Sequence, residues 1–147
     1  MFTLPVEDQI VLRLHDDFRL GDFYALIDRN REHLGRFLEW TEHHQSAENT
    51  RSYVQMERRA FAAGNAIVTR IYDGDQVIGS VGLTLTNPGW KIGEIGYWLG
   101  AEYSGRGYVT RAARTLLDYG FGVLGLHKIV LRAIRSNTRS IEVARRL

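Results

Sequence analysis

The stretch EIGYWLGAEYSGRGYVTRAARTLLDYGF, residues 94–121, decides the fold. Its pattern predicts a strand over Ile92–Leu99, a loop containing Gly105 and Gly107, and then a helix whose apolar residues share one face. A strand, a glycine loop and a helix direct backbone N–H groups and the positive end of the helix dipole at one place, where an anion can bind. Spacing alone also allows this loop to be no more than a tight turn.

The segments before this stretch predict antiparallel strands. Apolar and β-branched residues fill Ala66–Tyr72 and Val77–Leu85, and Asp73-Gly74-Asp75 between them is a turn sequence. A second turn at Thr86–Gly89 leads into the strand over residues 92–99. Three successive strands should therefore form an antiparallel meander.

The remaining segments complete the expected domain. We predict strands at Gln9–Leu14 and Lys128–Ala133, two helices between Phe18 and Trp40 that break at residues 28–31, a helix from Ser46 to Gly64, and a last helix that opens at Asn137. The fold class is α/β: a mixed, mainly antiparallel sheet with helices on both faces and a cleft between the strands at 92–99 and 128–133. We expect residues 1–147 to form a single domain.

Composition limits the class of protein. The chain has 147 residues, of which 44% are hydrophobic and 24% charged, which is typical of a globular protein of about one domain. Cysteine is absent, which excludes thiolate nucleophiles, disulfides and cysteine-ligated zinc. No apolar run approaches the length of about 20 residues that a membrane span needs, and the start of the chain does not resemble a signal peptide. We expect a cytoplasmic protein without a membrane partner.

Charge is unevenly distributed along the chain. Residues 103–147 carry nine Lys or Arg and two acidic residues, so a polyanion would prefer this segment. Motifs typical of nucleic-acid binding are missing, and we expect no nucleic-acid partner. The glycine loop also lacks the Gly-Lys-Ser/Thr of a nucleotide P-loop, and Thr110 stands where a Rossmann fingerprint needs glycine. His33, His43 and His44 match no helical ligand spacing, so we expect no metal site.

Residues 94–121 resemble the acetyl-CoA-binding core of the GNAT acetyltransferase superfamily, whose loop has the pattern Gln/Arg-x-x-Gly-x-Gly/Ala. Gly107 matches the central glycine, whereas Ser104 and Val109 depart from the first and last positions. Two further motifs, Asn30-Arg31-Glu32-His33-Leu34 with Trp40 and Asn137-Thr138-Arg139-Ser140, resemble the branch named for ribosomal-protein N-terminal acetyltransferases.

The resemblance implies where acetyl-CoA binds. The pantetheine amides would pair with the strand backbone at Tyr97, Trp98 and Leu99. The pyrophosphate would rest on the glycine loop, whose residues are Ser104, Gly105, Arg106, Gly107, Tyr108 and Val109. Asn137 of the last helix would contribute one further contact. Arg111 or Arg114 could meet a phosphate, or form a solvated helix face.

Acetyl transfer to an amine needs a base, polarisation of the thioester carbonyl and a proton for the leaving thiolate. Glu94 is the expected base, with a structural carboxylate as the alternative, and a strand amide near Tyr97 or Trp98 would polarise the carbonyl. The resemblance implies that Ser140 donates to the thiolate and that Asn137 orients Ser140; otherwise both are helix-start residues. Tyr97 and Tyr108 are alternative proton donors.

The resemblance also implies an acceptor. We expect Asn30, His33, Phe37 and Trp40 to wall its pocket, although helix packing would also explain the aromatic residues. The predicted reaction is direct transfer from acetyl-CoA to the α-amine of a protein or peptide; a small amine or antibiotic acceptor, or a non-catalytic acyl-CoA-binding module, are the alternatives. Relatives continue with a C-terminal β-hairpin that we expect this chain to lack, so that further chain or a partner subunit, as in a homodimer, would cover the last strand's edge.

Overall fold

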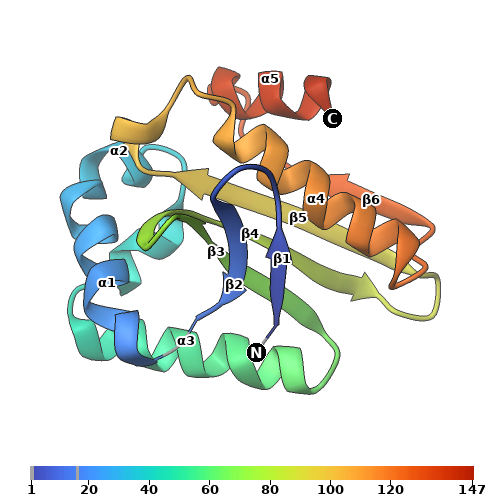
Figure 1. Ribbon diagram of the computed structural model, residues 1–147, viewed down its shortest axis with the longest axis horizontal. Coiled ribbons are helices and arrows are strands. Elements are labelled where there is room, and N and C mark those ends of the chain that lie inside the picture. The colour runs from blue at the N-terminus through green and yellow to red at the C-terminus, as the bar shows by residue number, and fades with distance from the viewer. Residues whose placement is uncertain (1, 16) are drawn as a thin grey trace.

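A six-stranded sheet forms the centre of the molecule. The structure is a computed structural model that describes residues 2–15 and 17–147. The strands lie in chain order across the sheet and are β1 (Thr3–Pro5), β2 (Ile10–Leu14), β3 (Ala66–Asp73), β4 (Gln76–Asn87), β5 (Ile92–Leu99) and β6 (Lys128–Leu131) (Figure 1). Every neighbouring pair is antiparallel except β5 and β6, which are parallel. The mixed, mainly antiparallel sheet is confirmed.

Helices connect and cover these strands. They are α1 (Leu20–Arg29), α2 (Arg31–Gly35), α3 (Ala47–Ala62), α4 (Tyr108–Gly122) and α5 (Thr138–Arg146), with 3₁₀ turns η1 (Asp17–Arg19), η2 (Glu39–His43) and η3 (Ala101–Tyr103). Ser46 caps α3 by accepting the Asn49 N–H, and Gly64 follows its end with φ of 74°, as predicted. None of the helices within the described ranges is long and apolar enough to cross a bilayer.

Each face of the sheet carries its own core. On one face, Ala112, Ala113 and Leu116 of α4 pack against Leu83 and Ile95 of β4 and β5. A second cluster lies on the other face, where α1 and α3 meet the ends of β3 and β4; its buried members are Leu20, Phe23, Leu26, Ile27, Val54, Tyr72 and Val77. The prediction of helices on both faces is therefore confirmed.

Several elements differ from the sequence prediction. The second helix expected up to Trp40 ends at Gly35, because glycine is a poor helix former and Leu38 is extended. β1 was not predicted: it has only three residues, too few to show a period, and Pro5 is tolerated because β1 lies at the sheet edge. β6 ends at Leu131 instead of Ala133.

The short pairing of β6 opens the predicted cleft. β5 and β6 pair only from Ile92 with Lys128 to Ile95 with Leu131. Among the described residues, no strand pairs with the outer edge of β5 at residues 96–99. After β6, the chain leads into α5. The backbone N–H and C=O groups on this edge are therefore free to pair with another molecule.

Two buried histidines make the fold sensitive to acid. His15 is 4% and His44 1% exposed. Three of their ring nitrogens have no hydrogen-bond partner among the described residues: both nitrogens of His15, and Nε2 of His44. Burial, reinforced by nearby arginines, lowers the pKa of His15 from 6.5 to about 3 and that of His44 from 6.5 to about 4. Both rings are neutral in the folded chain.

We expect the free energy of unfolding to fall by about 2 kcal/mol for each histidine between about pH 7 and about pH 5. The unfolded histidines take up protons below pH 6.5 and the folded ones do not, so stability is lost as the pH falls through this window. Urea titrations at several pH values measure the slope. His15→Leu should remove about half of the loss in unfolding free energy between these pH values. His43→Leu, at an exposed position, should leave that loss unchanged. An unchanged slope in His15→Leu would contradict the assignment.

Candidate functional site

A cavity of about 520 Å³ lies along the free edge of β5. We call it the edge cavity. Its walls come from β5, the loop before α4 with the first turn of α4, the length of α5, and α2 with the residues after it. The residues predicted for the site that line it are His33, Phe37, Tyr97, Trp98, Leu99, Ser104, Gly105, Gly107, Tyr108, Val109, Asn137 and Ser140. The structure thus places residues that are distant in sequence around one cavity.

The loop before α4 is built to receive an anion. Gly105 and Gly107 have φ of 82° and 75°, in the region that favours glycine. Gly107 is the N-cap of α4 and no side chain caps the helix, so the first N–H groups of α4 face the cavity without an intrahelical partner. Arg139 and Arg146 add positive charge to the same cavity, which Glu142 also lines. This arrangement fits a pyrophosphate group.

The edge of β5 fits the other part of the expected acetyl donor. A pantetheine arm carries amide groups, and residues 97–99, which line the edge cavity on the unpaired edge of β5, offer amide partners next to the anion site. The cavity therefore suits acetyl-CoA by backbone geometry as well as charge, although Ser104 and Val109 depart from the family pattern. Val109 packs against the core beneath the loop.

Tyr97 and Ser140 meet across the edge cavity. The Tyr97 hydroxyl donates to the Ser140 carbonyl oxygen at 2.8 Å, and the Ser140 hydroxyl donates to Tyr97 Oη at 3.3 Å. Asn137 Oδ1 accepts the backbone N–H of Ser140 at 3.2 Å, so it caps α5 and fixes Ser140 at the same time. Burial raises the pKa of Tyr97, which keeps its hydroxyl protonated at neutral pH.

A second cavity, of about 390 Å³, lies on the sheet face that α1 and α3 cover. We call it the sheet cavity. Aromatic residues form one side of it and strand residues form its floor; the predicted site residues among its lining are Trp40, Glu94, Tyr97 and Trp98. Leu38, Tyr97 and Trp98 line both cavities, so the two meet at this end of β5.

The floor of the sheet cavity holds a buried ion pair that sequence reasoning missed. Arg70 of β3 is 1% exposed and donates to Glu57 of α3 and, at 3.1 Å, to Ser80 Oγ. Its guanidinium lies 3.9 Å from the centre of the Phe23 ring. Only the alternation of β3, which turns Arg70 to the face of α3, could have indicated it; no local motif links Arg70 to Glu57.

Glu94 lies in the sheet cavity and not among the residues that line the edge cavity. Its side chain is 33% exposed, and its Oε2 lies 3.5 Å from Nε of the largely exposed Arg132. A partly solvated ion pair of this kind is weak, so Arg132 does not hold the Glu94 carboxylate firmly.

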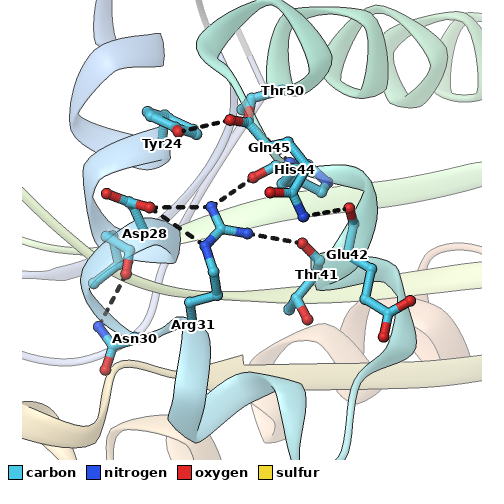
Figure 2. A network of polar contacts seen from close by, with 10 residues as sticks. Tyr24, Asp28, Asn30, Arg31, Thr41, Glu42, His44, Gln45 and Thr50 are labelled. Carbon is cyan, nitrogen blue, oxygen red and sulfur yellow. Dashed lines mark hydrogen bonds and ion pairs between the residues drawn. The ribbon is translucent and has the colours of Figure 1, made fainter.

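Arg31 holds the segment from Thr41 to His44, which directly follows Trp40; Figure 2 shows its contacts with Thr41 and His44. Its guanidinium donates to the carbonyl oxygens of Thr41 at 3.0 Å and His44 at 2.6 Å, while Asp28 Oδ1 lies 3.1 Å away on its other side. The clamp fixes η2, and η2 places the Trp40 ring 5.7 Å from that of Trp98 in the wall of the sheet cavity. Arg31 thus shapes a cavity that it does not line.

Removing this clamp should loosen the wall. We expect Arg31→Ala to lower the free energy of unfolding by about 2 kcal/mol, because two charge-assisted bonds to partly buried carbonyls are lost. Chemical denaturation measures this loss, and near-ultraviolet circular dichroism follows the packing of Trp40. Arg36→Ala is the control, since Arg36 makes only an exposed pair with Glu32 at 3.5 Å. Equal losses in both variants would contradict a clamp.

Some predicted residues lie elsewhere. Asn30 lines neither cavity: it is 4% exposed, donates to the Leu26 carbonyl and accepts the Ala101 N–H, so it joins α1 to η3 instead of facing an acceptor. Arg106 is exposed and lines neither cavity. Its backbone carbonyl accepts a bond from Arg111.

Tyr108, Arg111 and Arg114, for which the sequence left alternatives open, all make structural contacts. The Tyr108 hydroxyl donates to Asp73 at 3.0 Å, which ties the start of α4 to β3. Arg114 donates to the Arg146 carbonyl and links α4 to α5, and Arg111 bonds to the loop carbonyls and to Glu7. Both arginines therefore support the walls of the edge cavity.

Comparisons with known proteins agree with this geometry. A family model described as the acetyltransferase (GNAT) domain matches residues 9–147. YdaF of Bacillus subtilis (strain 168), a ribosomal N-acetyltransferase by name, is 32% identical over 149 residues, covering 100% of this chain and 81% of its own length. The ribosomal-protein-serine acetyltransferase of Escherichia coli (strain K12) is 29% identical, covering 98% of this chain and 80% of its own length.

A solved structure gives the same result. The structure of RimL, the ribosomal L7/L12 alpha-N-protein acetyltransferase, in complex with coenzyme A superposes with a TM-score of 0.94 at 26% identity. The match covers 99% of this chain and 82% of RimL. A family model matches most of the chain, and a relative 32% identical covers all of it. The chain therefore belongs to the GNAT acetyltransferase family and is an acetyl-CoA-dependent N-acetyltransferase.

Proposed function

We propose that this enzyme acetylates the α-amino group of a protein or peptide N-terminus by direct attack within a ternary complex. The observation that carries the proposal is the meeting of two separate cavities at Tyr97 and Trp98. An acetyl donor in the edge cavity and an acceptor in the sheet cavity can be bound together, so that the acetyl group needs no covalent carrier on the enzyme. The chain also has no cysteine that could serve as one.

The charges of the sheet cavity favour a single ammonium group. Glu57 lies in the floor of the cavity, where it is buried and paired with Arg70. Glu94 remains as the carboxylate that a substrate can reach, and Arg132 balances it in the free enzyme. A polyamine would bring several positive charges to a cavity with one carboxylate to offer, whereas an N-terminal residue brings one. Relatives whose names refer to ribosomal proteins support the same choice, because they match the chain from end to end.

The residues take the following roles in this proposal. Acetyl-CoA supplies the acyl thioester when bound. Glu94, directly or through water, takes the proton of the acceptor ammonium, and a β5 backbone N–H near Tyr97 or Trp98 polarises the carbonyl. Ser140 and Tyr97 provide the proton for the departing thiolate, and Asn137 positions Ser140. A homodimeric assembly and a cytoplasmic location stay predictions.

The test is thiol release with a panel of amines. Peptides that begin with Ser, Ala or Met should be acetylated on the α-amine, which mass spectrometry locates, and initial rates at varied concentrations of both substrates should give intersecting lines. The same peptides with a blocked N-terminus but a free lysine are the matched control. Acetylation of spermidine or of the lysine in preference to the free N-terminus would overturn the proposal.

A further inference from the structure

The sheet cavity has a strip of floor without side chains. Gly82 of β4 and Gly96 of β5 are direct partners in the antiparallel register, and both line the cavity. Two adjacent strands therefore expose their backbones at the same level of the sheet. On this face, a bound molecule can approach the main chain more closely at this pair than at the neighbouring positions.

The two glycines differ in what surrounds them. A Cβ at Gly82 would lie 3.2 Å from Cγ2 of Val68, so this position is restricted by the protein itself. A Cβ at Gly96 would have no atom within 4 Å, and Gly96 is exposed. Neither glycine has a positive φ, so the backbone at Gly96 accepts any residue suited to a strand. Folding alone therefore gives no steric reason for a glycine at position 96.

The neighbours of Gly96 supply what an amino-terminal residue needs. Glu94 and Trp98 are two positions away on either side of Gly96, and therefore lie on the same face of β5. One end of the strip carries a carboxylate for an ammonium group, and the other carries an indole that packs against Trp40. Across the strip on β4, Thr84 pairs with Glu94 and Ser80 pairs with Trp98.

We infer that Gly96 is the seat of the acceptor's first residue and determines which acceptors the enzyme accepts, an inference that rests on the proposed function. The main chain of the first residue lies over Gly96, between the Glu94 carboxylate and the Trp98 indole. A side chain at position 96 would occupy the same space. It would leave the anion loop and the edge cavity untouched, because Gly96 does not line the edge cavity.

The test compares Gly96→Ala and Gly96→Val with the wild-type enzyme. Gly122→Val is the matched control, because a Cβ at Gly122 also has no atom within 4 Å and Gly122 lines neither cavity. Thermal unfolding checks the fold, calorimetry gives the acetyl-CoA affinity, and thiol release gives kcat/KM for peptides that begin with Gly, Ala, Ser or Leu.

We expect Gly96→Val to retain acetyl-CoA affinity within about twofold and to lose at least about tenfold in kcat/KM, mainly through KM for the peptide. Gly96→Ala should lose less, and its loss should grow with the size of the first side chain. This size dependence separates occupation of the seat from a general loss of structure. If wild type and Gly122→Val acetylate the peptides and Gly96→Val does so equally well, the inference is wrong and the proposed function stands.

A different result would identify failure of the proposed function. If the wild-type enzyme acetylates a small amine and none of the peptides, the proposed function is wrong, and with it the peptide acceptor inferred here. Gly96→Val is then assayed with that amine. A loss in kcat/KM would keep position 96 as the acceptor seat, whereas unchanged kinetics would remove it.

Discussion

Gly107→Glu should abolish acetyl-CoA binding. Gly107 has φ of 75° and is the N-cap of α4, where backbone N–H groups point into the edge cavity. A Cβ there would have only Arg111 Nε within 4 Å, at 3.9 Å, so the added side chain has room to enter the anion site. A carboxylate in that position would use the N–H groups that a pyrophosphate needs and would repel its charge. We expect an affinity at least about 100-fold lower.

The control for this prediction must carry the same backbone strain. Gly64 has nearly the same φ, 74°, lies at the end of α3, and has no atom within 4 Å of its Cβ position. Gly64→Glu should therefore lower the melting temperature about as much as Gly107→Glu, through about 1 kcal/mol of left-handed strain, and leave binding unchanged. Calorimetric titration with acetyl-CoA measures both variants. Normal binding by a folded Gly107→Glu would contradict the assignment of the loop as the anion site.

The central strands could be predicted because local signals were strong and agreed with one another. β5 spans Ile92–Leu99 as predicted, and β3 and β4 differ from the prediction only at their ends. Alternating residues and glycine turns act over a few neighbours, so they are visible in one sequence. β1 and η2 were missed because their conformations depend on partners elsewhere: β1 exists through its pairing with β2, and η2 is held by Arg31.

The candidate site also has a part that local sequence motifs could predict and a part that depends on tertiary contacts. The residues of the edge cavity come largely from two continuous segments, 97–109 and 137–140, whose motifs a resemblance can carry. The sheet cavity is assembled from α1, α3 and the strands, and its floor pair, Glu57 and Arg70, is a tertiary contact between a helix and a strand. Asn30 shows the opposite error: it belongs to a recognisable motif, but its amide group is used to hold the fold together.

The contact between Ser140 and Tyr97 raises a question that the fold alone does not answer: which hydroxyl delivers the proton. In the structure the Ser140 hydroxyl donates to Tyr97 Oη over a long 3.3 Å, while Tyr97 donates to the Ser140 carbonyl at 2.8 Å. The longer bond is the weaker one, so the Ser140 proton is the easier of the two to redirect toward the sulfur of a bound thioester. Ser140 is thus the expected direct donor, and Tyr97 holds it in place.

Ser140→Ala should therefore lower kcat by about 100-fold, the usual range for losing a general acid, and change acetyl-CoA affinity by less than about twofold. The helix should remain capped, because Asn137 accepts the backbone N–H of residue 140, which alanine also has. Ser136→Ala, in the turn before α5 and outside both cavities, is the matched control. Single-turnover thiol release, measured together with calorimetry, separates the chemical step from binding.

Tyr97→Phe and the double variant identify the donor. If Ser140 donates directly, Tyr97→Phe should cost clearly less than Ser140→Ala, and the double variant should be no slower than Ser140→Ala, because Tyr97 would have nothing left to position. If Tyr97 donates, Tyr97→Phe alone should reproduce the full loss. Unchanged turnover in Ser140→Ala, with normal turnover in the control, would remove Ser140 as the acid and leave Tyr97, whose hydroxyl contacts Ser140, as the candidate donor.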